Sequence, residues 1–144
     1  MTLMFRAPRT SVIGLVLAAL LASAAGVEVA MATDWDPGAF KDESTLEFMS
    51  LRDSGREHWS PVWLVVVNGE LYLRLGNRAV GNLKRSTIYP ATRIRVAGRE
   101  FDAQMVEAND MAGPVADAMA GKYGFDLLVR YWPHPLTARI QPPD

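Results

Sequence analysis

Residues 61–75 read PVWLVVVNGELYLRL, and this stretch decides the fold. A run of β-branched and aromatic residues precedes Asn68-Gly69, and an alternating run of leucines follows it. Asn-Gly between two apolar runs favours a type I′ turn, because both residues tolerate a positive φ angle. The stretch therefore predicts a β-hairpin with strands at residues 61–67 and 70–75.

Further short strands are predicted on both sides of this hairpin. Weak alternation at residues 44–51 precedes turn residues at 53–55, and residues 92–97 and 100–106 alternate on either side of Gly98-Arg99. Residues 136–140 predict a last short strand. Five or six short strands, mostly in hairpins, indicate a mainly β (α+β) fold built as a small antiparallel barrel.

One main helix is predicted late in the chain, at residues 110–123. Pro114 lies near its start, apolar residues follow at helical spacing, and Gly124 is a stop signal. Residues 76–85 read as a loop that leads into a short helix. Sequential hairpins do not build a doubly wound sheet, and the chain has neither a GxGxxG nor a Walker loop.

Composition excludes several classes of protein. The chain has 144 residues, 49% of them hydrophobic and 22% charged, which fits one folded domain and no disordered chain. It has no cysteine, so disulfides, cysteine-ligated zinc and thiol catalysis are excluded. A net charge of −1 gives no long-range attraction for nucleic acid, and we expect none as a partner.

The first 32 residues read as a targeting segment. Arg6 and Arg9 precede an apolar stretch at residues 11–27 that lacks charge, as in a secretory signal peptide. Its length also permits an uncleaved membrane anchor. Both interpretations leave a domain at residues 33–144 that is exported to the periplasm or beyond the cell. If translation starts at Met31 instead, the protein is cytoplasmic.

The residue pattern offers one candidate binding site and no catalytic constellation. Basic residues cluster around a strand-to-helix turn that contains Gly76-Asn77, namely Arg74, Arg78, Lys84 and Arg85. Guanidinium groups and exposed amides at a helix start can bind phosphate, whereas a solvated basic face explains the same residues without a ligand. No carboxylate pair, Ser-His-Asp set or metal-ligand spacing is present. His58 and His134 are far apart in the sequence, and as haem ligands they are a weaker hypothesis.

Several motifs, taken in order, resemble the flavin-binding split-barrel superfamily. They are Ser54-Gly55-Arg56, WSPVW at 59–63, NGELYLR at 68–74, RIRVAGREF at 93–101, AGKYG at 120–124 and TARI at 137–140. Within the superfamily the chain is most similar to the small bacterial DUF2255-type proteins. These are related to deazaflavin-dependent nitroreductases and pyridoxamine-phosphate-oxidase-like domains.

The resemblance implies a six-stranded antiparallel split β-barrel with one main helix, and a homodimer with FMN or a deazaflavin near the subunit interface. The implied cofactor-binding residues are Arg56, Pro61, Val62, Trp63, Arg74, Gly76, Asn77, Arg78, Lys84 and Arg85. Pro61, Val62 and Trp63 flank the ring, and the basic residues hold phosphate. Tyr131, Trp132 and His134 edge the pocket of an unknown small-molecule substrate.

The implied function is a flavin- or deazaflavin-nucleotide-binding, oxidoreductase-like protein. Its cofactor performs the hydride chemistry, so that no side chain acts as acid or base. Two alternatives stay open. One is a non-enzymatic exported barrel that binds another ligand and no cofactor, and the other is a haem-binding barrel with His58 or His134 as the axial ligand.

Overall fold

The predicted hairpin is confirmed by the computed structural model, which describes residues 34–124 and 133–144. Its strands are β2 (Glu57–Val67) and β3 (Glu70–Leu75). Asn68 and Gly69 have φ angles of 51° and 79°, both positive as a type I′ turn requires. β2 begins earlier than predicted, because its pairing with the preceding strand continues through Pro61 to Glu57.

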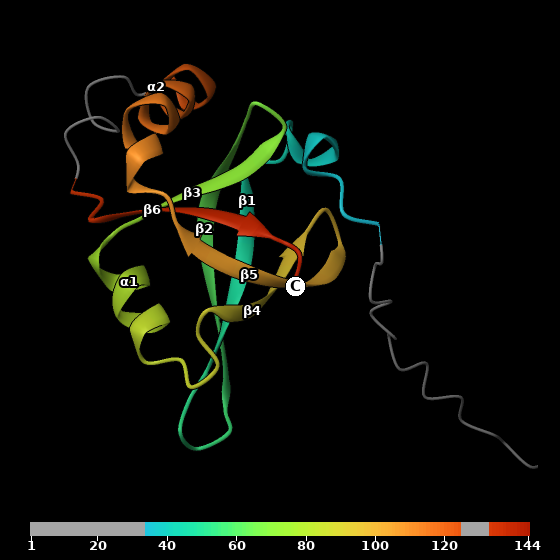
Figure 1. Cartoon of the computed structure of the whole chain (residues 1–144), viewed down its shortest axis with the longest axis vertical. Coiled ribbons are helices and arrows are strands. Elements are labelled where there is room, and N and C mark those ends of the chain that lie inside the picture. The colour runs from blue at the N-terminus through green and yellow to red at the C-terminus, as the bar shows by residue number, and fades with distance from the viewer. Residues whose placement is uncertain (1–33, 125–132) are drawn as a thin grey trace, which may run out of the picture.

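Six strands close into one antiparallel barrel (Figure 1). The other four are β1 (Thr45–Leu51), β4 (Ala91–Val96), β5 (Arg99–Glu107) and β6 (Leu136–Gln141). The order around the barrel is β1-β2-β3-β6-β5-β4, so the C-terminal strand lies between β3 and β5. The predicted antiparallel barrel is therefore confirmed.

The seam between β1 and β4 is the shortest in the barrel. Only two residue pairs join these strands, Glu47 with Arg95 and Phe48 with Ile94. β1 and β2, by comparison, are paired along the whole length of β1. A six-stranded barrel with one short seam fits a small split barrel, and the seam leaves the first residues of β1 without a β4 partner.

The interior of the barrel is filled by apolar side chains, which alternate with polar ones along the strands as the sequence predicts. Inward-facing residues of all six strands are buried, among them Leu46, Phe48, Leu64, Leu71, Leu73, Ile94, Phe101, Met105 and Ile140. The short 3-10 helix η1 (Pro37–Phe40) adds Phe40 to this core. Burying side chains of this size stabilises the fold by about 1.5–3 kcal/mol each.

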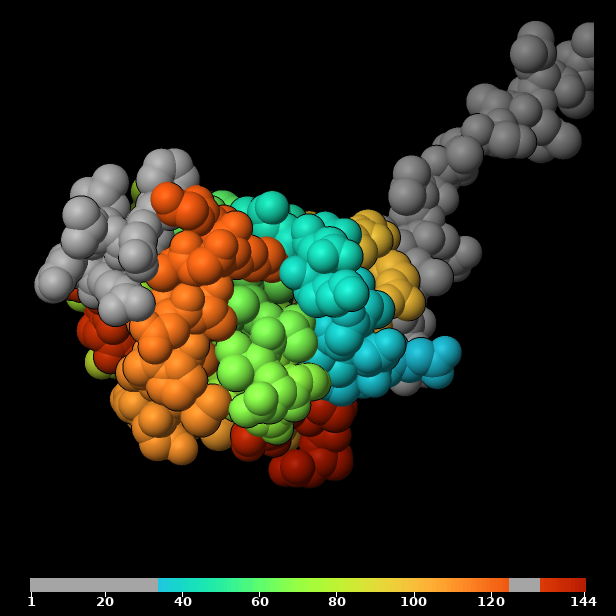
Figure 2. All heavy atoms as spheres, turned by 90° about the horizontal axis from the view of Figure 1, so that it is seen from above, coloured from blue at the N-terminus to red at the C-terminus, as the bar shows by residue number. Residues whose placement is uncertain are grey.

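Two helices lie on the outside of the barrel. α1 (Asn77–Lys84) follows β3 directly, where a short helix is predicted. The predicted late helix is confirmed as a 3-10 turn, η2 (Asn109–Met111), continuing into α2 (Ala112–Tyr123). α2 packs across β2 and β3 (Figure 2). It buries Val115 and Met119 against Val65 and Tyr72.

The second hairpin turns one residue earlier than the sequence predicts. Gly98-Arg99 is wrong as the turn, since β5 already begins at Arg99 and the two turn residues are Ala97 and Gly98. A type I′ turn needs two successive positive φ angles, and these residues have φ of 52° and 72°. Ala97 therefore adopts the left-handed conformation in spite of its Cβ atom.

We expect Ala97→Asn to raise the free energy of unfolding by about 0.5–1 kcal/mol, because asparagine adopts the left-handed region more readily than alanine. Gly98→Ala should lower it by about 1 kcal/mol, since its Cβ meets no neighbour and only the backbone conformation is penalised. Urea unfolding followed by circular dichroism measures both. Changes of the same sign in the two variants would contradict this account of the turn.

Several sequence predictions lie outside the described residues. The signal or anchor segment at 1–32 is one of them, and so are Tyr131 and Trp132. Among the residues that the structure describes, no helix has the length and hydrophobicity needed to cross a membrane.

Candidate functional site

The residues predicted to flank a flavin ring line one pocket on the outside of the barrel. This β2 pocket has a volume of about 230 Å³, and its walls are Pro61, Val62, Trp63, Arg74, Met119 and His134. They come from β2, the end of β3, α2 and the segment before β6. The structure thus brings together three predicted ring-binding residues, one predicted phosphate ligand and one predicted substrate residue.

Trp63 is an exposed aromatic residue of this pocket, and its ring packs on a second aromatic ring. Its side chain is 43% exposed, unusually so for tryptophan on a strand. Its ring stacks on Tyr123 at the end of α2, with centroids 4.7 Å apart and an angle of 14° between the planes. The stack fixes the orientation of this partly exposed ring.

The end of α2 is anchored to the barrel by two residues that the sequence did not single out. The Tyr123 hydroxyl lies 2.6 Å from the carbonyl oxygens of both Ser44 and Leu64, and burial raises its pKa. Lys122 Nζ donates to the carbonyl oxygens of Glu43 and Leu64, and burial lowers its pKa. Both residues belong to the AGKYG motif. Their position just before the glycine that ends the helix is the one sequence feature that could have identified them.

A second pocket adjoins the first along β2. This α1 pocket has a volume of about 300 Å³ and is lined by His58, Trp59, Ser60, Pro61, Arg78, Ala79 and Asn82. Pro61 lines both pockets, so they form neighbouring parts of one surface. Arg78 therefore faces the pocket next to the one that Arg74 lines.

The turn from β3 into α1 has the features of a phosphate site. Gly76 is the N-cap and has no side chain, so the cap residue gives the backbone amides of the first turn no side-chain acceptor. Arg74 ends β3 half-buried, and its burial lowers the pKa of its guanidinium. Asn77 and Arg78 are exposed in the first turn of the helix.

The structure separates the other two predicted phosphate ligands from this turn. Lys84 and Arg85 lie at the opposite end of α1, and eight helical residues span about 12 Å. They line a third pocket of about 510 Å³, the hairpin cleft, together with Arg52, Asp53, Ser54, Ser86 and Thr87. Arg56 is exposed in the turn between β1 and β2 and lines none of these three pockets.

A buried polar network, which the sequence did not reveal, connects the α1 pocket to the hairpin cleft. At its centre is Asn82, only 7% exposed. Its Nδ2 donates to Ser60 Oγ at 3.0 Å and lies 3.2 Å from His58 Nε2, which therefore accepts. Its Oδ1 accepts from Arg52 at 2.9 Å and from Arg85 at 3.1 Å. His58, named above as a possible axial haem ligand, thus has its Nε2 in contact with Asn82.

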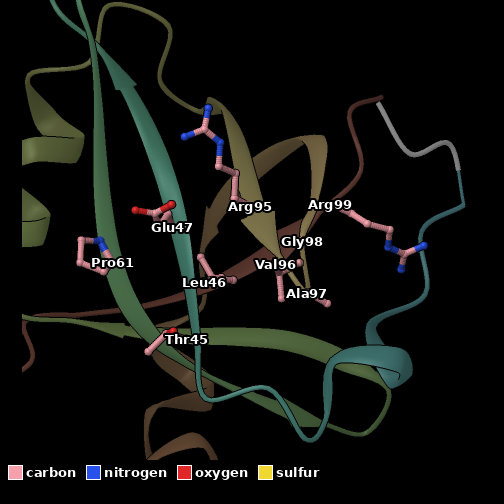
Figure 3. A pocket seen from close by; sticks show the side chains of 9 residues that line it. All are labelled: Thr45, Leu46, Glu47, Pro61, Arg95, Val96, Ala97, Gly98 and Arg99. Atoms are coloured by element: carbon pink, nitrogen blue, oxygen red, sulfur yellow. The ribbon is translucent and has the colours of Figure 1, made fainter. Parts of the chain in front are cut away.

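A fourth pocket lies at the short seam between β1 and β4 (Figure 3). It has a volume of about 460 Å³ and is lined by Thr45, Leu46, Glu47, Pro61, Arg95, Val96, Ala97, Gly98 and Arg99. Pro61 is the only predicted site residue among them. Arg95 is already bonded to Glu100 at 3.0 Å and lies over the Trp59 ring, so its charge is compensated.

Within residues 34–124 and 133–144, no three His, Asp or Glu side chains gather closely enough to hold a metal ion. The β2 and α1 pockets together offer a planar apolar wall at Trp63 and two cations near a helix start. This combination suits a ligand with an aromatic ring and a phosphate.

No protein-family model matches the chain. No curated protein matches it either. Among solved structures, the haem storage protein HutZ from Vibrio cholerae is similar, with 20% identity and a TM-score of 0.53. The match covers 74% of this chain and 87% of HutZ.

Two further solved structures have lower scores. A FAD-binding protein from Mesorhizobium loti is 14% identical with a TM-score of 0.48, and the match covers 74% of this chain and 86% of that one. A conserved hypothetical protein from Mycobacterium tuberculosis is 19% identical with a TM-score of 0.48, covering 83% and 85%. The likeness to HutZ shows that the chain has a split-barrel fold.

Proposed function

We propose that this chain is an exported, oxidoreductase-like split-barrel protein that binds a flavin or deazaflavin nucleotide along the outer face of β2. One observation carries the proposal. Pro61, Val62 and Trp63 form one pocket with Arg74, and Arg78 lines the adjoining pocket. A flat wall and two cations side by side match the two ends of a flavin mononucleotide.

The residues fit such a cofactor in chemistry and in size. Ligand pockets are commonly about 300–1,000 Å³. The β2 pocket alone, at about 230 Å³, is below that range, and the α1 pocket beside it adds about 300 Å³. A ring against Trp63 then places its phosphate chain toward the start of α1, where helix amides and Arg78 favour an anion.

When bound, the cofactor supplies hydride transfer. The protein's own residues bind and orient it: Trp63 covers one face of the ring, and Arg74 and Arg78 neutralise the phosphate. His134 edges the same pocket and contributes to the substrate position.

The same proposal includes three more specific points. They are the kinship with DUF2255-type proteins and deazaflavin-dependent nitroreductases, the targeting role of residues 1–32, and a homodimer. A second copy is proposed because the β2 and α1 pockets are open to solvent and small, and a partner surface would exclude water from the ring.

Haem binding is the second candidate, and the position of His134 supports it. This histidine lines the β2 pocket with Trp63 and Arg74, so an axial ligand, an apolar wall and a cation for a propionate are present in one place. HutZ, which has this fold, is a haem storage protein. A barrel that binds neither cofactor is the third reading and is an outcome of the test below.

The test is a titration of the purified full chain with FMN, a deazaflavin nucleotide and haemin, followed by absorbance and fluorescence. We expect saturable flavin or deazaflavin binding near one per chain. Arg74→Glu/Arg78→Glu should weaken it at least about 100-fold, because two charge-assisted contacts are worth about 1.5–3 kcal/mol each. Trp63→Ala should reduce the quenching of flavin fluorescence.

Lys41→Glu is a control charge reversal outside the site, since Lys41 is exposed and lines neither pocket. Equal flavin affinity in the double reversal and in this control would contradict the proposed site. A Soret band that is lost in His134→Ala, without flavin binding, would favour the haem candidate. Absence of binding to all three would favour a barrel without a cofactor.

A further inference from the structure

We propose that the hairpin cleft is a second anion site, which binds a phosphate or sulfate group independently of the proposed cofactor site. The cleft lies between the β1–β2 turn and the C-terminal end of α1. Its principal residues are Arg52, Lys84, Arg85, Ser86 and Thr87. Two arginines are held together there, they lack a counter-charge, and one of their buried donors lacks an acceptor.

Two guanidinium groups converge on one neutral oxygen. Arg52 Nη2 and Arg85 Nη2 both donate to Asn82 Oδ1, at 2.9 and 3.1 Å. Asn82 is itself held in place by Ser60 and His58, so it keeps both arginines at the cleft. Two like charges placed this close repel each other unless an anion compensates them.

The protein supplies no carboxylate to this pair. Among the described residues, neither Arg52 nor Arg85 forms an ion pair, and Asp53, which also lines the cleft, is exposed and forms none either. Three other arginines of the barrel are paired with carboxylates. Arg93 and Arg95 are both bonded to Glu100, and Arg139 is bonded to Glu70. The cleft is therefore a place where positive charge lacks a partner, and Lys84 adds a third cation.

One nitrogen of the Arg52 guanidinium lacks an acceptor. Its Nη1 is buried and has no hydrogen-bond partner within the described residues. Leaving a buried donor unsatisfied costs about 1–3 kcal/mol, and more when the donor is charged. An anion in the cleft that Arg52 lines provides the missing oxygen with a small shift of the side chain.

The walls of the cleft are fixed before any ligand arrives. Ser86 Oγ accepts from the Leu51 amide at 3.1 Å, and the Thr87 amide donates to the Leu51 carbonyl at 2.9 Å. These bonds tie the segment after α1 to the end of β1. Ser86 keeps its hydroxyl proton available to donate, so hydroxyl and guanidinium donors surround the cleft as in other oxyanion sites.

The ligand class follows from charge and volume. Guanidinium forks suit tetrahedral oxyanions, which accept two parallel bonds. The cleft volume of about 510 Å³ exceeds what one bare phosphate needs, so a small organic ester is accommodated as well. The shared chemistry is a phosphate or sulfate group, and the arms of the experiment separate the free ion from the ester.

The test is calorimetric titration of the purified full chain with inorganic phosphate, inorganic sulfate and glycerol 2-phosphate, at constant ionic strength set with chloride. We expect binding of at least one of them in the millimolar range or tighter. Arg52→Gln and Arg85→Gln should each weaken it about tenfold or more. Arg85→Gln serves if Arg52→Gln fails to fold, because the exposed Arg85 leaves the Arg52–Asn82 bond intact. Tighter binding of glycerol 2-phosphate would identify the ester as the better ligand.

Lys41→Gln is the charge-matched control and should bind the anion normally. The Arg74→Glu/Arg78→Glu variant separates this site from the proposed cofactor site, and it should also keep the anion. Arg52→Gln in turn should keep flavin affinity unchanged. Loss of the anion in the double reversal, with no effect of Arg52→Gln or Arg85→Gln, would overturn the proposal. No binding of any of the three anions at 10 mM would overturn it too.

Discussion

Phe101→Ala is expected to lower the free energy of unfolding by about 3–5 kcal/mol, which is usual for deleting a buried phenyl ring. Phe101 points into the barrel from β5 and is 2% exposed. Its ring meets Phe40 and Trp35 edge to face, with centroids 5.5 and 5.7 Å away. Since Phe40 and Trp35 belong to the segment that leads into β1, the substitution also loosens η1 from the barrel.

Urea unfolding followed by tryptophan fluorescence measures this loss, and Trp35, which precedes η1, is one of the four tryptophans that contribute to the signal. Phe101→Leu should cost less than Phe101→Ala, because leucine refills much of the cavity. Asp102→Ala is a matched neighbour on the same strand that is exposed, so we expect a change within about 0.5 kcal/mol. A cost for Phe101→Ala no greater than that of Asp102→Ala would show that the ring is not part of the core.

Most of the barrel follows from local sequence patterns, because a strand with one face in the core must alternate. The run through Leu71, Leu73 and Leu75 sets both the strand and the side that it buries. Local sequence patterns do not predict how the barrel closes. The position of β6 between β3 and β5, and the two-residue seam between β1 and β4, depend on pairings between distant segments.

The candidate site was predictable only in part, for the same reason. Pro61, Val62 and Trp63 are consecutive on one strand, and the β3 hairpin necessarily brings Arg74 back near them. Lys84 and Arg85 look equally close in the sequence, but a straight eight-residue helix carries them to its far end. The cluster of charges in the sequence is therefore divided in the structure between the two ends of α1.

The network at Asn82 left no signal that a sequence pattern detects. Asn82 lies in a polar stretch of a short helix, where exposure is the default expectation. Its partners His58, Ser60 and Arg52 are 22 to 30 residues away. Only the packing of α1 against β2 makes it a buried group that holds two cations.

Asn82→Leu is expected to lower the free energy of unfolding by about 2–4 kcal/mol, because it leaves several polar groups without partners. The Ser60 hydroxyl, which is buried, loses its donor at 3.0 Å, and Arg52 loses the acceptor at 2.9 Å. Leucine has the same number and branching of side-chain heavy atoms as asparagine, so the substitution leaves no cavity. Urea unfolding measures the loss, and Asn77→Leu, at an exposed position of the same helix, is the control.

Asn82→Asp separates the stability of this network from its proposed role in anion binding. Aspartate keeps an acceptor for Arg52 and Arg85 and now pairs with their charges. Ser60 can rotate its hydroxyl to donate, and His58 can donate from Nε2 in its other tautomer. We therefore expect a loss of stability of at most about 1 kcal/mol, well below that of Asn82→Leu. The same carboxylate cancels positive charge at the hairpin cleft, so phosphate affinity should fall about tenfold or more, one such step being about 1.4 kcal/mol. If Asn82→Asp instead binds phosphate as the unaltered chain does, the two arginines are not what attracts the anion.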